Sequence, residues 1–149
     1  MQLGSVFIWK NFSRSKDGTV KDRYFVYVGE SHFPDNPISI FLITTTTRKM
    51  HYKVGGSREK HNIYKFKAGI FGFIEDSILD VDSYYDLKKE YLDCCLSEIE
   101  TICCLPEYVL KEIYDLILKS KNISLKIKEN IYISYNQAGI TGLKRPSRK

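Results

Sequence analysis

The sequence predicts an α+β fold in which a small antiparallel β-barrel is followed by a C-terminal helix. Short runs rich in β-branched and aromatic residues fill the first half of the chain, and 13% of all residues are aromatic. The second half changes to the apolar spacing of helices. A chain of 149 residues suits one domain with its own core. We expect that domain to span residues 1–142, with a barrel core at about 4–82 and a helical part at about 84–121.

Five segments are predicted to be strands. Ser5–Phe12 and Arg23–Gly29 are apolar and aromatic runs too short for helices. Ile38–Thr47 ends in four threonines, whose β-branched side chains disfavour a helix. Asn62–Lys67 alternates apolar and polar residues, as expected of a strand with one solvated face. Ser77–Val81 is expected to add a further short strand.

The second half is predicted to contain one clear helix, and three other segments differ from it. Pro106–Lys119 has the apolar spacing of an amphipathic helix and begins with Pro and Glu. Tyr84–Leu96 is ambiguous between helix and strand. Ile123–Tyr135 alternates and is predicted to be a late strand or a segment that depends on a partner. Residues 143–149 contain four cations and no anion, and we expect a loose basic tail.

Charge is unevenly distributed along the chain. Residues 1–75 hold 12 Lys and Arg against 6 Asp and Glu, whereas residues 76–142 hold 7 against 12. The basic half is where a polyanion would bind. The same lysines could equally serve solubility alone, and charge does not separate the two interpretations.

Cysteine usage and hydropathy indicate the compartment. Cys94-Cys95 and Cys103-Cys104 do not have zinc-ligand spacing, so they are expected to be free thiols in a reducing environment. The first residues lack the apolar stretch of a signal peptide, and no uncharged run approaches the roughly 18 residues of a membrane span. We expect a cytoplasmic protein with no membrane partner.

Arg23 and Thr44 are the strongest candidates for chemistry. Arg23 opens a strand after a polar loop, and Thr44 lies near the end of a strand expected to neighbour it. A planar guanidinium and a hydroxyl can hold a phosphodiester and stabilise the charge of a pentavalent transition state. Both residue types are also ordinary in strands. The hypothesis therefore requires the two side chains to meet on an accessible surface, with the arginine outside a buried structural ion pair.

Other candidates are weaker. His51 and His61 are isolated in the basic half, where either could act as an acid or base beside a phosphate or be an ordinary surface or core residue. Asp80 and Asp82 would share one face of a strand, so they could hold a divalent ion or form a solvated acidic edge.

The order of these features resembles the MazF/PemK family of toxin ribonucleases, of which this chain would be a divergent and longer member. The family has Pro after the arginine where this chain has Tyr24, and its compact members have no counterpart of Tyr84–Lys149. The resemblance rests on the segments Gly4–Phe12, Ser13–Asp22, Arg23–Val28 and Ile40–Thr45.

The resemblance implies a Src-homology-like barrel of the MazF/PemK/CcdB type, usually a homodimer. It implies the toxin of a toxin–antitoxin system, a metal-independent endoribonuclease that cleaves single-stranded RNA such as mRNA and needs no cofactor. Arg23 would stabilise the phosphorane, and Thr44 would hold the phosphate or the attacking hydroxyl. The partner would be a cognate antitoxin whose flexible acidic segment occupies the RNA groove. Expected RNA-binding residues are Lys21, Tyr24, Thr45, Arg48, Lys49, Tyr52, Lys53 and Arg58, with Phe33 and Lys60 as further candidates.

The alternative is a non-catalytic binding protein on the same fold, either a CcdB-like gyrase inhibitor or a nucleic-acid-binding adaptor. Tyr24 and the additional C-terminal part favour this alternative. A metal-dependent nuclease built on Asp80 and Asp82 is a third hypothesis.

Overall fold

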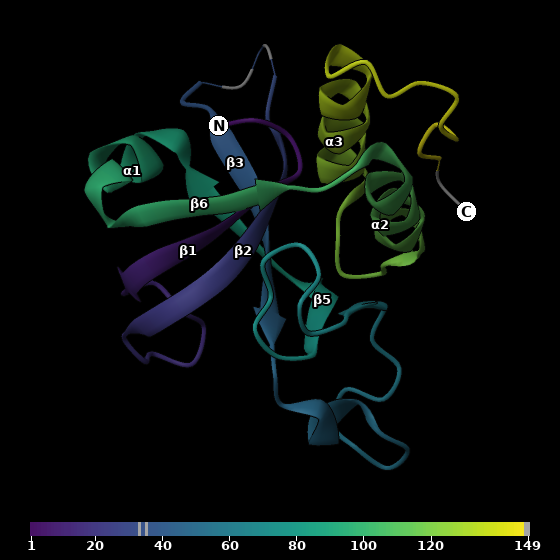
Figure 1. The fold of residues 1–149 in the computed structure, drawn as a ribbon. Helices are drawn as coiled ribbons and strands as arrows, with labels where there is room; N and C mark the ends of the chain where they lie inside the picture. Colours follow the sequence, from purple (N-terminus) through teal and green to yellow (C-terminus); the bar gives the residue numbers. More distant parts are fainter. Residues whose placement is uncertain (33, 35, 148–149) are drawn as a thin grey trace.

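The computed structural model describes residues 1–32, 34 and 36–147. Within them the chain forms an α+β fold with a six-stranded antiparallel half-barrel sheet and three α-helices (Figure 1). The sheet order is β4-β5-β3-β2-β1-β6. Its strands are β1 (Ser5–Phe12), β2 (Lys21–Glu30), β3 (Ser39–Thr46), β4 (Ile63–Phe66), β5 (Ser77–Lys88) and β6 (Ile99–Cys104). The helices are α1 (Lys89–Cys94), α2 (Glu107–Lys119) and α3 (Leu125–Gln137), and the short 3-10 turns are η1 (Lys49–Tyr52) and η2 (Leu96–Glu98).

The strands predicted in the first half are confirmed. β1 has the predicted bounds, and β2, β3 and β4 overlap the other three predicted strands. β5 is longer than predicted, because its second half continues the ladder with β3 as far as the pair Ser39 and Lys88. The sequence does not predict β6, which pairs with β1. The sheet therefore extends beyond residue 82, and the part expected to be helical contributes strand residues at both 84–88 and 99–104.

The helix predicted at Pro106–Lys119 is confirmed as α2, whereas the strand predicted at Ile123–Tyr135 is wrong. That segment forms α3, whose first turn is capped by Ser124 Oγ accepting from Ile127 N at 3.3 Å. Ile127, Ile131 and Tyr135 are four residues apart and therefore lie on one helix face, and the last two are buried. The alternation of apolar and polar residues that suggested a strand over Ile123–Tyr135 also places apolar residues four apart, which is the spacing of a helix face.

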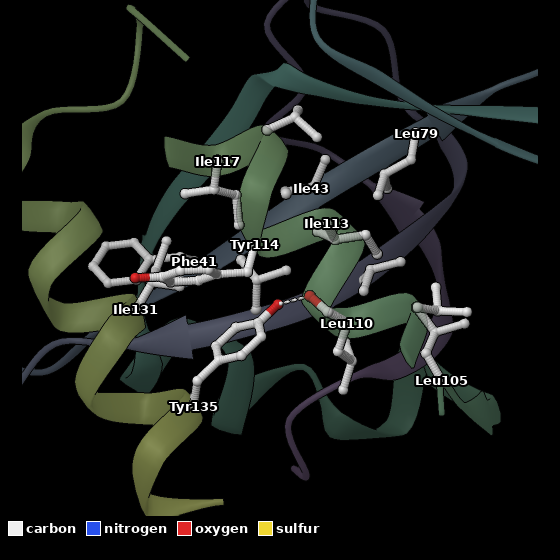
Figure 2. Close-up of a cluster of buried hydrophobic side chains, with 14 of the residues drawn as sticks. Phe41, Ile43, Leu79, Leu105, Leu110, Ile113, Tyr114, Ile117, Ile131 and Tyr135 are labelled. Atoms are coloured by element: carbon white, nitrogen blue, oxygen red, sulfur yellow. Dashed lines mark hydrogen bonds between the residues drawn. The ribbon is translucent and has the colours of Figure 1, made fainter. Parts of the chain in front are cut away.

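Successive side chains of a strand point to opposite sides of the sheet, and each side carries a cluster of buried apolar residues packed against helices. On one face Phe41, Ile43 and Leu79 pack under α2 and α3, as Figure 2 shows. In the same view Tyr135 Oη donates to the Leu110 carbonyl at 3.0 Å and joins the two helices. On the other face a second cluster lies beneath α1, and its members include Phe7, Trp9, Phe12, Phe25, Tyr27, Ile40, Leu42, Tyr85, Leu87 and Leu92.

The C-terminal segment lies beside α2 and α3 (Figure 1). Tyr114 Oη donates to the Lys144 carbonyl at 2.5 Å, and Pro146 is buried. The described part of residues 143–149 is therefore docked on the domain. None of the helices in the described residues is long and apolar enough to cross a membrane.

Candidate functional site

An open pocket of about 140 Å³ lies where the ends of β2 and β3 meet β5. The loop before β2 and the segment containing η1 border it. We call it the Arg23 pocket. Its described lining residues are Lys16, Asp17, Lys21, Arg23, Thr44, Thr45, Thr46, Arg48, His51, Tyr52, Arg58, Asp80, Ser83 and Tyr85.

Arg23 and Thr44 line this same pocket, although they are far apart along the chain. The sheet register is the cause, because β2 and β3 pair antiparallel with Phe25 opposite Thr44. Thr44 Oγ1 donates to the Tyr24 carbonyl at 3.3 Å, a long bond that holds the hydroxyl only weakly. The two candidate catalytic side chains therefore line one pocket.

The Arg23 guanidinium already has an anionic partner. Its Nη2 lies 3.2 and 3.1 Å from the two Asp17 oxygens and donates to Thr19 Oγ1 at 3.2 Å. Its Nε is buried and has no hydrogen-bond partner among the described residues. The Arg23 side chain is 14% exposed, whereas Asp17 is 55% exposed and lies on the loop before β2. Hydrogen bonds from Ser15 and Thr19, with a smaller effect of Arg23, hold the pKa of Asp17 well below its usual range.

The pocket is predominantly cationic. Its described lining includes five Lys and Arg side chains against the carboxylates of Asp17 and Asp80. Lys16 Nζ donates to the Tyr84 carbonyl at 2.6 Å and lies 5.0 Å from the Tyr85 ring centroid. Burial lowers the pKa of the Lys16 ammonium. An excess of fixed positive charge with hydroxyl groups between is suited to a phosphate.

The predicted RNA-binding residues are distributed over adjoining hollows. Lys49 and Lys53 line a hollow that shares Tyr52 with the Arg23 pocket. Tyr24 lines another beside Arg23, and its ring packs on Phe73 at a centroid distance of 5.7 Å. The remaining predicted residues, Lys21, Thr45, Arg48, Tyr52 and Arg58, line the Arg23 pocket itself. Lys60 is exposed, and Phe33 lies outside the described residues.

Asp80 is the buried anchor of one wall of the pocket. Its side chain is 1% exposed, and Oδ2 accepts from Tyr52 Oη at 2.8 Å and from Ser83 Oγ at 3.1 Å. The His61 Nδ1 lies 2.8 Å from the same oxygen, and Arg58 Nη1 donates to Tyr52 Oη at 3.1 Å. Burial raises the pKa of Tyr52 to about 12, so the phenol stays neutral at physiological pH. The carboxylate thus fixes the position of Tyr52 and, through it, of Arg58.

His61, Asp80 and Asp82 are close enough together to hold a metal ion, with ligand atoms within 4.8 Å of one another. All four carboxylate oxygens, however, already accept hydrogen bonds from the protein. Asp82 accepts from the Asn62 backbone N–H at 2.6 Å and from Ser120 Oγ. A metal would have to displace these donors, so the donor set fits a hydrogen-bonded network better than a metal site.

Two members of the pocket have roles that the sequence does not indicate. Asp17 belongs to a polar loop, and the Ser15 and Thr19 bonds that aim it at Arg23 have no periodic signal. The sequence suggests Asp80 as a metal ligand or a solvated residue. It is buried instead, because η1 and the segment after it bring Tyr52 and His61 over it.

No protein-family model and no curated protein matches this chain.

Proposed function

We propose that this protein is a metal-independent endoribonuclease that cleaves single-stranded RNA, as the toxin of a toxin–antitoxin pair resembling the MazF/PemK family. The observation that carries the proposal is that Arg23 and Thr44 line one open, predominantly cationic pocket. The half-barrel sheet is compatible with the small barrel that this family would have. The hydrogen-bonded state of the Asp80 and Asp82 carboxylates favours chemistry without a metal.

The proposed reaction is a transesterification within the RNA. The ribose 2′-oxygen attacks the adjacent phosphorus and loses its proton to solvent. The bond from phosphorus to the 5′-oxygen breaks, that oxygen takes up a proton, and a 2′,3′-cyclic phosphate remains. Arginine stays protonated at neutral pH, so Arg23 contributes charge stabilisation rather than proton abstraction. Thr44 Oγ1, held only weakly by Tyr24, can turn to donate to a phosphate oxygen.

The Asp17 partner of Arg23 is compatible with this role. Asp17 is 55% exposed on its loop, so the carboxylate half of the pair can move aside for an anionic ligand, whereas Arg23 is 14% exposed and stays in place. A phosphodiester offers the same two-oxygen face to Nη2 that the carboxylate now offers. RNA binding would therefore release Asp17 from the guanidinium.

The test is digestion of single-stranded RNA in EDTA, read on a gel. Wild-type protein should cleave, and Arg23→Ala should lower the rate by about 10²–10³. Arg23→Lys should fail as well, because a point charge does not replace the planar fork. Arg14→Ala is the matched control, because Arg14 lies 4.0 Å over the Tyr91 ring and does not line the Arg23 pocket. Equal cleavage by wild type and a folded Arg23→Ala variant would reject the catalytic role.

A second candidate is a non-catalytic binding protein with the same surface, including a gyrase-binding or nucleic-acid adaptor protein. The observation that favours it is the engagement of Arg23 by Asp17, which leaves the arginine side chain 14% exposed. This candidate predicts RNA or protein binding without cleavage under any metal condition. The same gel, run beside an anisotropy titration with uncleaved RNA, distinguishes the two functions.

The proposed partners follow from the resemblance. An antitoxin with a flexible acidic segment would compete with RNA for the Arg23 pocket, which its cationic lining favours. Displacement of labelled RNA by an acidic peptide tests this competition. Light scattering after size exclusion tests the proposed homodimer.

A further inference from the structure

A second cationic cavity, of about 420 Å³, lies where the end of α2, the start of α3 and the C-terminal segment meet. We call it the tail pocket. Of its described lining residues, five are Lys or Arg and none is Asp or Glu. The lining is Leu118, Lys119, Ser120, Lys121, Ile123, Lys128, Lys144, Arg145, Pro146 and Ser147.

The folded chain fixes the framework of the tail pocket. Lys128 Nζ donates to the Leu118 and Ser120 carbonyls at 3.0 and 2.7 Å, so this lysine caps the end of α2. The Tyr114 hydroxyl bond to Lys144 O and the burial of Pro146 hold the backbone that carries Lys144 and Arg145. Tertiary contacts therefore form this cavity and position the backbone that carries Lys144 and Arg145.

The other four cations of the tail pocket lack local neutralisation. Lys119 is suited to the negative end of the α2 dipole. In the described part of the chain, no carboxylate forms an ion pair with Lys119, Lys121, Lys144 or Arg145. Three of the five cations come from residues 76–142, where acidic side chains outnumber basic ones by 12 to 7, and the other two come from the basic C-terminal segment. Unneutralised cations around a hollow are complementary to an anionic ligand.

The tail pocket and the Arg23 pocket adjoin the same part of β5. Asp80 and Ser83 line the Arg23 pocket. Asp82, between them, accepts from Ser120 Oγ, and its carbonyl accepts from Asn122 Nδ2 at 3.4 Å. Ser120 in turn lines the tail pocket. Both pockets therefore border the β5 segment around Asp82, and an RNA strand that extends from the Arg23 pocket toward the end of α2 would meet the second cluster of cations.

We propose that the tail pocket binds backbone phosphates of the same single-stranded RNA whose scissile phosphate occupies the Arg23 pocket. This inference rests on the proposed function, and it assigns that function a substrate of extended length. Lys121, Lys144 and Arg145 contact the phosphates, whereas Lys128 keeps the end of α2 in place. Backbone contacts of this kind add affinity without base preference.

The experiment measures binding of fluorescent oligouridylates to the Arg23→Ala protein, which keeps the RNA intact. Two lengths of about 4 and about 16 nucleotides span the usual range of single-strand sites. The double variant Lys121→Glu/Arg145→Glu is compared with Lys10→Glu/Lys111→Glu, which changes net charge equally and leaves both pockets unaltered. Poly-glutamate and inorganic phosphate serve as competitors.

The tail-pocket variant should bind the long RNA severalfold more weakly than the control. Its salt dependence, the slope of log K against log salt, should become shallower by about 0.7 for each phosphate that the protein no longer neutralises. The short RNA should bind both variants equally. Equal weakening in the two double variants, equal weakening for both lengths, or displacement by poly-glutamate as readily as by RNA would each overturn the inference.

The two proposals fail separately. If wild-type protein does not cleave RNA but the length-dependent weakening is observed, the nuclease function fails and the tail pocket remains an RNA site. If wild type cleaves and the tail-pocket variant binds like the control, the inference fails and the nuclease function stands.

Discussion

Replacing Asp80 by Ala should destabilise the fold as well as the pocket wall. The carboxylate is 1% exposed and accepts from Tyr52, His61, Ser83 and the Asp82 amide. One hydrogen bond to a charged group contributes about 1.5–3 kcal/mol, and donors left buried add a desolvation cost. The losses do not add fully, because the His61 side chain is 28% exposed and regains water. We therefore expect a loss of about 2–4 kcal/mol in the free energy of unfolding.

Urea unfolding followed by fluorescence measures this loss, because Trp9 is the single tryptophan and is fully buried. With an m value of about 2 kcal/mol/M, the midpoint should fall by about 1–2 M at unchanged slope. Asp86→Ala is the matched control, since Asp86 is an exposed residue of the same strand and its removal should cost no more than about 0.5 kcal/mol. Equal midpoints for the Asp80 and Asp86 variants would refute the assignment of Asp80 as the anchor.

Three further predictions concern the pocket, the core and pH. Asp17→Asn should strengthen RNA binding severalfold in an anisotropy titration, because it removes the anion facing Arg23, and an unchanged affinity would argue against displacement of Asp17 by phosphate. Ile113→Ala should cost about 2–5 kcal/mol in urea unfolding, because Ile113 of α2 is fully buried in the core, and a loss below about 1 kcal/mol would mean that α2 is peripheral. Burial raises the pKa of Tyr52 and Tyr114 to about 12, so the folded state retains protons that the unfolded chain has lost. The ordinary pKa of a tyrosine in an unfolded chain is near 10, so the contribution of Tyr52 and Tyr114 to stability is complete below pH 10 and should fall between pH 10 and about 12. Urea midpoints and phenolate absorbance measured over this range test the prediction, and a midpoint that does not change with pH would contradict it.

The sequence predicted correctly those elements whose apolar spacing fits only one type of secondary structure. The Ile38–Thr47 run and the Pro106–Lys119 spacing each fit one kind of element, and both were confirmed. The Ile123–Tyr135 segment fitted two, because apolar residues four apart satisfy both an alternating strand and a helix face. β6 has a burial pattern with no fully buried residue, so its membership in the sheet depends on pairing with β1 rather than on a local signal.

From the sequence, only the part of the candidate site that lies on two neighbouring strands could be predicted. Arg23 and Thr44 line the same pocket because neighbouring antiparallel strands bring their ends together, as expected from two strands predicted to lie side by side. Asp17 takes its position from an irregular loop, where Thr19 Oγ1 donates to it. Asp80 is positioned by hydrogen bonds between side chains far apart in sequence. Such contacts have no period along the chain.

Packed side chains cover both faces of the sheet, and this affects which residues of the domain can be substituted. With its broad surfaces occupied by apolar packing, the sheet meets solvent chiefly at strand ends and along the loops that leave them. Most residues that would recognise a ligand are thus distinct from those that stabilise the fold. Substitutions at exposed residues of the strand ends and loops, such as Lys21 or Arg48, should cost little stability, so side chains at these positions could be exchanged on an unchanged framework.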